Sequence, residues 1–158
     1  MYPNNNGDSK YASQQAYING SQQPSSQWTT GLCGCFEDTS SCMTTCCCPF
    51  ITFGRNAEII DRGRTTCASA GLIFYLLNCC AFMYSCTYRT KLRGLYSLPE
   101  EPCKDCCVHY FCVCCALCQE YRELKNRGLD PAIGWTANAE KINQNGKTPP
   151  YVVPGMDR

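Results

Sequence analysis

An uncharged apolar run constrains this chain more than any other feature of its sequence. The nineteen residues from Ala68 to Cys86 carry no formal charge. As an α-helix this run would be about 28 Å long, close to the roughly 30 Å hydrocarbon core of a bilayer. Arg64 precedes the run and Arg89 follows it, so both ends are cationic. The run predicts a transmembrane helix, with a buried core helix as the alternative.

A second apolar run covers residues 106–118 and is shorter. As a helix its thirteen uncharged residues reach about 20 Å, which is short for a span. The run could cross a thinned bilayer, re-enter it, or pack on the first helix. A charged amphipathic pattern begins at Glu120, and Gly128 with Pro131 ends it. We expect one helix over about 105–127, apolar first and charged last.

The flanking segments differ in composition from this centre. Residues 1–30 are rich in Asn, Gln and Ser, which predicts a disordered polar tail. Residues 129–158 carry four prolines and are expected to be irregular. Between them, residues 31–128 form the predicted membrane domain, where Pro49 starts a first helix and Gly63 stops it. The expected fold is mostly α: a small cysteine-rich helical membrane protein with one to two transmembrane helices and disordered tails.

Cysteine is unusually frequent, at 17 of 158 residues. The first thirty residues lack the apolar stretch of a secretory signal, so we expect reduced thiols. Thiolates are soft ligands that select zinc, copper(I) and cadmium, and four within reach make a closed site. Two groups are the predicted metal ligands: the block Cys42, Cys46, Cys47 and Cys48, and a stripe along one helix face formed by Cys103, Cys107, Cys114 and Cys118. The alternative is that these cysteines are small apolar residues that pack helices.

Carboxylates and the single histidine complete the candidates. Glu58 and Glu120 lie next to the apolar helices, where acidic groups can attract hydrated cations. His109 sits within an apolar run, and no orienting acid or oxyanion hole is evident, so we do not expect an enzyme. The net charge of +1 argues against nucleic acid as a partner.

Three stretches resemble a known family. Residues 42–50 (CMTTCCCPF) resemble the CC/CL-xxxx-CPC motif of the plant cadmium resistance family, which belongs with the cell number regulator and placenta-specific-eight proteins. Residues 53–59 are similar to the segment that follows this motif. Residues 118–128, with Gly134-Trp135 after them, resemble its C-terminal signature. Phe50 stands in place of the last motif cysteine, and Met43 stands where Cys or Leu is usual.

The resemblance implies a small plasma-membrane protein that self-associates. It implies efflux or redistribution of the divalent metals zinc or cadmium, with Cys42, Cys46, Cys47 and Cys48 at the site and no tightly bound cofactor. One chain of this size cannot enclose a pore, so the expected partners are the lipid bilayer, further copies of the chain and the metal ions. The alternative is a membrane-anchored interaction protein that regulates cell number and organ growth without transport. Its cysteines would then be acylated, and residues 119–127 would recruit partners.

Overall fold

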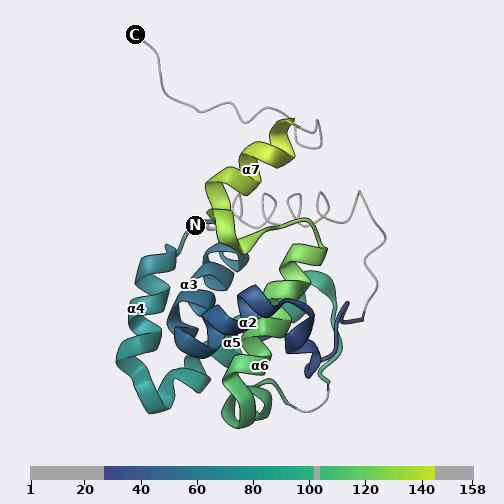
Figure 1. Cartoon of the computed structure of the whole chain (residues 1–158). Coiled ribbons are helices and arrows are strands. Elements are labelled where there is room, and N and C mark those ends of the chain that lie inside the picture. The colour runs from purple at the N-terminus through teal and green to yellow at the C-terminus, as the bar shows by residue number, and fades with distance from the viewer. Residues whose placement is uncertain (1–26, 102–103, 145–158) are drawn as a thin grey trace, which may run out of the picture.

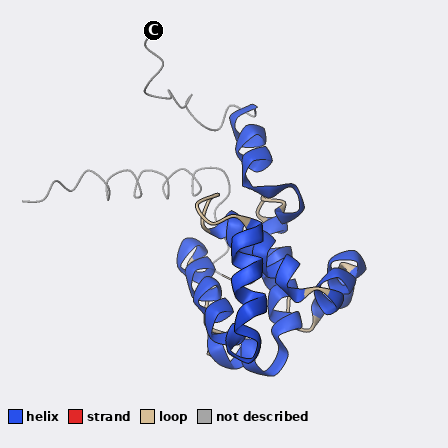
Figure 2. Cartoon of the chain, turned by 90° about the vertical axis from the view of Figure 1, so that its left-hand side faces the viewer, coloured by secondary structure: helices blue, strands red, loops and turns tan. Residues whose placement is uncertain are grey.

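The computed structural model describes residues 27–101 and 104–144, and all regular structure in that part of the chain is helical (Figures 1 and 2). This confirms the mostly α fold class. The elements in chain order are η1 (Gly34–Glu37), α2 (Thr39–Cys47), α3 (Pro49–Ile60), α4 (Cys67–Leu77), η2 (Asn78–Cys80), α5 (Ala81–Tyr96), α6 (Asp105–Asn126), η3 (Pro131–Ile133) and α7 (Gly134–Gln144). Helix α3 contacts α2, α4, α5, α6 and α7, while α7 projects from one end of the bundle.

The local signals for the first long helix are confirmed. Pro49 occupies the first turn of α3, where its missing N–H costs nothing. Gly63 follows the helix with a φ of 74°, which a residue without a Cβ adopts readily. Helix α4 then begins after Thr66, whose side chain accepts a hydrogen bond from the Ser69 amide.

The core is built around Phe53 of α3, which is fully buried. Its ring centroid lies 4.9 Å from that of Phe74 on α4 and 5.2 Å from that of Tyr88 on α5. Close approach of α3 and α4 depends on Gly54, because a Cβ there would lie 2.3 Å from the Cys67 carbonyl oxygen. Aromatic packing on one α3 residue therefore joins three helices.

The structure divides the helix predicted over 68–86. The backbone breaks at Asn78, which has a φ of 42°, and the chain continues through η2 into α5. Phe74 and Tyr88 both touch Phe53, although fourteen residues of straight helix would separate them by about 21 Å. The expectation of one straight helix is therefore wrong, and α4 and α5 form a hairpin. By length and composition alone, 67–96 is still the one segment in the described residues apolar enough to cross a membrane, and an 18-residue stretch within it has a mean hydropathy of 1.6.

The helix predicted over 105–127 is confirmed as α6, but it contains a kink. Cys112 has a φ of −150° and a ψ of 77°, which are not helical values. Residues before and after this point therefore do not share one face. The predicted stripe is interrupted between Cys107 and Cys114, and Cys103 lies outside the described residues.

The structure also differs from the sequence-based prediction at the boundaries of both tails. Helix α7 occupies residues that were expected to be irregular. At the other end, Trp28 donates a hydrogen bond from Nε1 to the Pro99 carbonyl (3.0 Å), so the ordered region begins before the expected boundary at residue 30. Most of the predicted tails, residues 1–26 and 145–158, lie outside the described part of the chain.

Candidate functional site

Several of the described thiols lie next to another thiol. In residues 27–101 and 104–144, no group of three or more His, Cys, Asp or Glu side chains is arranged to hold a metal ion. Cys79 lies 4.0 Å from Cys80, and Cys112 and Cys115 form a disulfide. Cys46 lies near Cys114, and Cys106 lies near Cys86. A closed four-thiolate site is therefore not assembled within this part of one chain.

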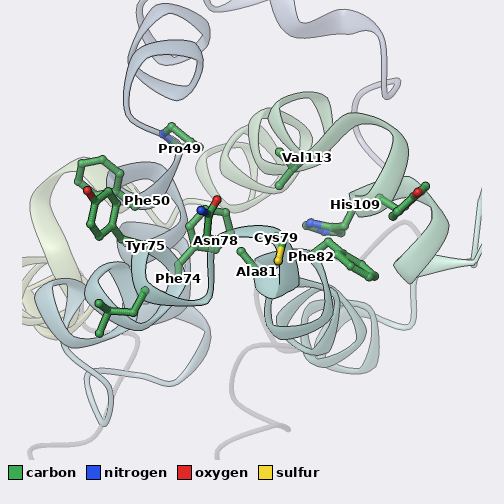
Figure 3. Close-up of a pocket in the computed structure, with 12 residues that line it drawn as sticks. Pro49, Phe50, Phe74, Tyr75, Asn78, Cys79, Ala81, Phe82, His109 and Val113 are labelled. Carbon is green, nitrogen blue, oxygen red and sulfur yellow. The ribbon is translucent and has the colours of Figure 1, made fainter.

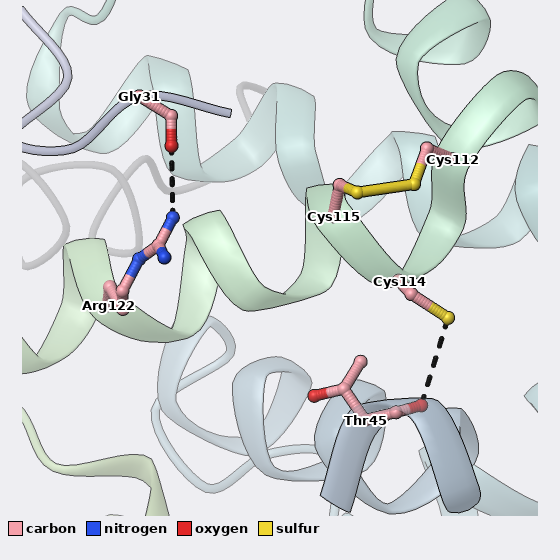
Figure 4. The surroundings of a disulfide bond; sticks show 6 residues. All are labelled: Gly31, Thr45, Cys112, Cys114, Cys115 and Arg122. Carbon is pink, nitrogen blue, oxygen red and sulfur yellow. Dashed lines mark hydrogen bonds between the residues drawn. A yellow bond between two sulfur atoms is a disulfide. The ribbon is translucent and has the colours of Figure 1, made fainter. Parts of the chain in front are cut away.

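The pair Cys46–Cys114 joins the two predicted cysteine groups. Cys46 is exposed in the last turn of α2, and its thiol lies near the half-buried Cys114 thiol on α6. The Cys114 thiol also donates to the Thr45 carbonyl at 3.8 Å (Figure 4). Thr45 is held in turn by a 2.9 Å hydrogen bond between its hydroxyl and that of Thr52 on α3. The arrangement presents two soft ligands from different helices at the surface.

The remaining predicted cysteines take different positions. Cys47 and Cys107 are exposed, Cys42 and Cys48 are half-buried, and Cys118 is buried in the bundle. Phe50, which replaces a motif cysteine, packs its ring edge-on to Tyr75 with the centroids 5.7 Å apart. This motif position therefore contributes an aromatic contact between α3 and α4.

The structure places Glu58 at two helix N-termini. One carboxylate oxygen accepts a hydrogen bond from the amide of Cys67 (3.1 Å), where α4 begins, and the other accepts one from the amide of Trp135 (2.9 Å), where α7 begins. Amides at helix starts lack intrahelical acceptors, and the helix dipole favours a negative charge there. Glu58 thus ties α4 and α7 to α3.

The structure places Glu120 in a buried ionic cluster that does not follow from the sequence pattern. Glu120 and Arg89 are both fully buried, with Glu120 Oε1 lying 3.5 Å from Arg89 Nη1. Arg89 Nη2 donates to Gln119 Oε1 (2.7 Å), and Arg89 Nε lies 3.4 Å from Asp105 Oδ1. The sequence predicts Arg89 as a cation that flanks a membrane helix, whereas the structure buries it. The useful signal was its position on the same helical face as Ser85, four residues earlier.

His109 extends this cluster. Its Nε2 lies 2.8 Å from Glu120 Oε1, and its Nδ1 lies 2.8 Å from the Ser85 hydroxyl. Eleven residues separate His109 from Glu120, which corresponds to about 16 Å along a straight helix. The contact exists because α6 bends at Cys112, beside the Cys112–Cys115 disulfide (Figure 4). The contacts run from Ser85 through His109 to Glu120, which is the serine–histidine–acid arrangement of a hydrolytic triad. Ser85 is fully buried, however, and so is out of a substrate's reach.

The segment before η1 covers the cluster. The Arg89 guanidinium lies 4.2 Å from the centroid of the Trp28 ring, a cation–π contact. Arg122 donates to the Gly31 carbonyl at 3.0 Å (Figure 4). Glu123 accepts from the Thr29 amide at 2.7 Å. The expectation that residues 119–127 form a partner-recruiting helix is wrong for 119–124, because these residues are buried here.

A cavity of about 640 Å³ lies beside the cluster (Figure 3). His109 lines it from α6, Phe50 from α3 and Tyr75 from α4. Cys79 of η2 contributes a thiol to its wall. The cavity is therefore mainly aromatic and apolar, and it lies near the break between α4 and α5.

Comparison with known proteins identifies related chains. The PLAC8 family model matches residues 28–123. "Cell number regulator 7" of Zea mays is 57% identical over 125 residues, covering 76% of this chain and 69% of the relative. "Protein PLANT CADMIUM RESISTANCE 12" of Arabidopsis thaliana is 51% identical over 139 residues, covering 87% of this chain and 86% of the relative. No solved structure matches this chain.

Proposed function

Because this chain belongs to the PLAC8 family, we propose that it is a plasma-membrane protein that mediates efflux or redistribution of divalent heavy metals, zinc or cadmium, as a homo-oligomer. The name of the Arabidopsis relative refers to cadmium resistance. The two names describe a regulator and a resistance protein, and neither denotes an enzyme. An apolar segment of sufficient length supports the membrane location.

The Cys46–Cys114 pair is the observation that carries the metal proposal. Zinc and cadmium prefer soft thiolates, and a closed site takes four ligands in a tetrahedron. One chain supplies two thiolates through this pair. Two copies, apposed through the exposed side of α2, would supply four thiolates around one ion. Cys42, Cys47 and Cys48 lie on or next to α2 and are the further predicted ligands in this region.

Metal flux into proteoliposomes tests this proposal. The full chain is reconstituted, and cadmium or zinc uptake is followed with a trapped fluorescent chelator. Efflux predicts that the variants Cys46→Ser and Cys114→Ser lower uptake strongly, because a hydroxyl is a poor ligand for a soft cation. Redistribution at one membrane face predicts no uptake, and cadmium binding is then lost in the same variants. Cys107→Ser is the matched control, since it removes an exposed thiol from the other arm of α6.

The stoichiometry adds a second readout. A site shared by two copies binds one cadmium ion per two chains, with the ultraviolet charge-transfer absorption of cadmium–thiolate bonds. Unchanged flux together with unchanged cadmium binding in both serine variants, with folding intact, would reject the site. Binding of one ion per chain without flux would instead indicate thiol buffering.

A second candidate function is a membrane-anchored interaction protein that regulates cell number and organ growth without transport. The Zea mays relative carries the name of a cell number regulator. The exposed thiols of Cys46 and Cys47 support this candidate, because such thiols next to apolar helices are acceptors for S-acylation. Acyl-exchange labelling of residues 46–48, together with metal flux no higher than in empty vesicles, would favour this function over transport.

A further inference from the structure

We propose that both apolar segments enter one membrane leaflet as hairpins and return to the same face, without crossing the bilayer. The inference rests on the proposed membrane location and specifies its geometry. A chain that does not cross the bilayer offers no path for efflux, so of the two proposed metal functions this geometry selects redistribution at one membrane face. The first hairpin consists of α4 and α5 and turns at Asn78. The second consists of the two arms of α6 and turns at Cys112.

Asp61 ties the two ends of the first hairpin together. Its Oδ2 accepts hydrogen bonds from the Thr65 hydroxyl (2.8 Å) and from the Tyr88 hydroxyl (2.8 Å). Its Oδ1 accepts one from Lys91 Nζ (2.9 Å). A straight helix would place residues 65 and 88 about 35 Å apart. Both ends of this segment therefore emerge at the same level of the molecule.

Arg89 ties the two arms of the second hairpin together. It forms ion pairs with Asp105 (3.4 Å) and with Glu120 (3.5 Å), which lie on opposite sides of the Cys112 kink. Fifteen residues of straight helix would separate these carboxylates by about 22 Å. Because Arg89 itself belongs to α5, a single buried guanidinium joins the second hairpin to the first.

The length of the hairpin arms decides how far they reach. Helix α4 has 11 residues and is about 16 Å long. A bilayer core is about 30 Å thick, so one arm reaches about half of it. Arg64 and Lys91, at 14 and 13 residues from Asn78, are then at the level of the lipid headgroups, where cationic side chains are favourable.

The side chains at the tip, which is the end of the molecule that holds both turns, are suited to contact with lipid. The chain carries no formal charge between Arg64 and Arg89 or between Asp105 and Glu120. Large side chains left exposed around the two turns are Leu72, Ile73, Tyr75, Leu76, Leu77, Met83, Tyr110 and Phe111. The two hairpins meet through Phe82 and Tyr110, whose ring centroids are 5.3 Å apart. A protein partner would require a polar rim, whereas this end offers an apolar surface without charge.

The backbone at the first turn is compatible with a lipid environment. Unpaired amides and carbonyls are costly there, so a break in a helix must satisfy its polar groups internally. The amide of Asn78 donates to the Tyr75 carbonyl, and the amide of Ala81 donates to the Asn78 carbonyl. The turn therefore continues the backbone pairing of its two arms.

Membrane topology tests the inference. A protease site is inserted between Pro99 and Glu101 in the full chain, and epitope tags are added at both ends. Sealed vesicles are first washed with alkaline carbonate and then treated with protease from outside. We expect the chain to stay with the membrane, and the inserted site and both tags to be accessible from one and the same face.

The other outcomes are distinct. Two crossing segments would leave the inserted site protected while both tags are cleaved, and one crossing segment would put the tags on opposite faces. Either result overturns the hairpin arrangement. Release of the chain by carbonate would contradict the proposed membrane location itself. Neither measurement involves metal, so cadmium binding by the thiols is judged separately. Metal uptake into sealed vesicles, by contrast, would show a path across the bilayer and would also overturn the hairpin arrangement.

A second measurement identifies what covers the tip. Leu76→Trp places a fluorophore at the tip, and Ile133→Trp places one at an exposed position of η3 near α7 as the matched control. In vesicles of brominated phosphatidylcholine, the added fluorescence at residue 76 is expected to be quenched, while that at residue 133 is not. Unquenched fluorescence at residue 76 would mean that protein, such as a second copy, covers this surface instead of lipid.

Discussion

The two parts of the α4–α5 hairpin have opposite chemistry. Around Arg89, near its open end, charged and polar side chains are fully buried and joined to one another. Around Leu76, at its turn, apolar side chains are exposed and no formal charge is present. In a water-soluble protein the positions would be reversed. The difference teaches that the buried ion pairs hold the hairpins folded, while the tip is left for another apolar phase.

Removal of Glu120 should have the largest effect on this arrangement. Glu120→Leu leaves Arg89 buried without this carboxylate, which costs about 3–5 kcal/mol of unfolding free energy. Urea unfolding in detergent micelles, followed by circular dichroism, measures it. Lys91→Ala is the control, because the Lys91–Asp61 pair is partly exposed and contributes less than about 1 kcal/mol. Equal costs for the two variants would contradict the role given to the buried cluster.

Loss of the histidine should have the next largest effect. His109→Leu removes the ring that joins Ser85 to Glu120, leaving buried polar atoms unpaired at a cost of about 1–3 kcal/mol. The same unfolding measurement applies. An exposed residue of the tip offers a control, since Met83→Ala should change stability by less than about 0.5 kcal/mol. A larger loss in the control would mean that the tip, not the cluster, maintains the fold.

Removal of Glu58 should have a smaller and more local effect. Glu58→Ala leaves the first amides of α4 and α7 without an acceptor, which costs about 1–2 kcal/mol. Hydrogen exchange at the amides of Cys67 and Trp135 reports the loss directly. Glu140→Ala, an exposed carboxylate on α7, should leave both amides protected. Unchanged hydrogen exchange in Glu58→Ala would contradict the assignment of Glu58 as a cap shared by α4 and α7.

Asp38 should give a weak pH dependence. A hydrogen bond from the Ser41 amide and another from Lys125 lower the pKa of Asp38, although partial burial opposes them. Its contribution to stability is therefore present above the unfolded value of 3.8 and is lost as the pH falls through the lower folded pKa. Solvent screening limits it to less than about 1 kcal/mol. Asp38→Asn should reduce the loss of unfolding free energy at low pH, as measured by a pH titration of stability. An unchanged loss would mean that other carboxylates cause it.

The tip should have the smallest effect on folding. Leu76→Ser removes an exposed apolar side chain and should change the unfolding free energy in detergent by less than about 0.5 kcal/mol. Membrane retention after carbonate washing should nevertheless fall, because the residue contributes to lipid burial. Strong destabilisation in micelles would show that Leu76 belongs to the protein core, and the comparison between the two parts of the hairpin would fail.

Part of this architecture was predictable from local patterns. Pro49 and Gly63 bound α3 as expected, and the change from apolar to charged residues located α6. The break at Asn78 also had a signal, because asparagine adopts positive φ more often than most residues. The ligand assignments were harder to predict. Glu58 lies at two helix starts and Glu120 in an ion pair, and both roles depend on residues distant in sequence.

The sequence by itself determined the helical class, the family, the uncharged runs and the supply of thiols, because these follow from composition and short motifs. Only the tertiary structure decided where those runs turn, which thiols meet, and that Arg89 bonds across both hairpins. The physical reason is that hydropathy records how apolar a segment is but not its direction. Direction is decided by contacts such as those of Asp61 with residues 65 and 88, which chain order alone keeps far apart.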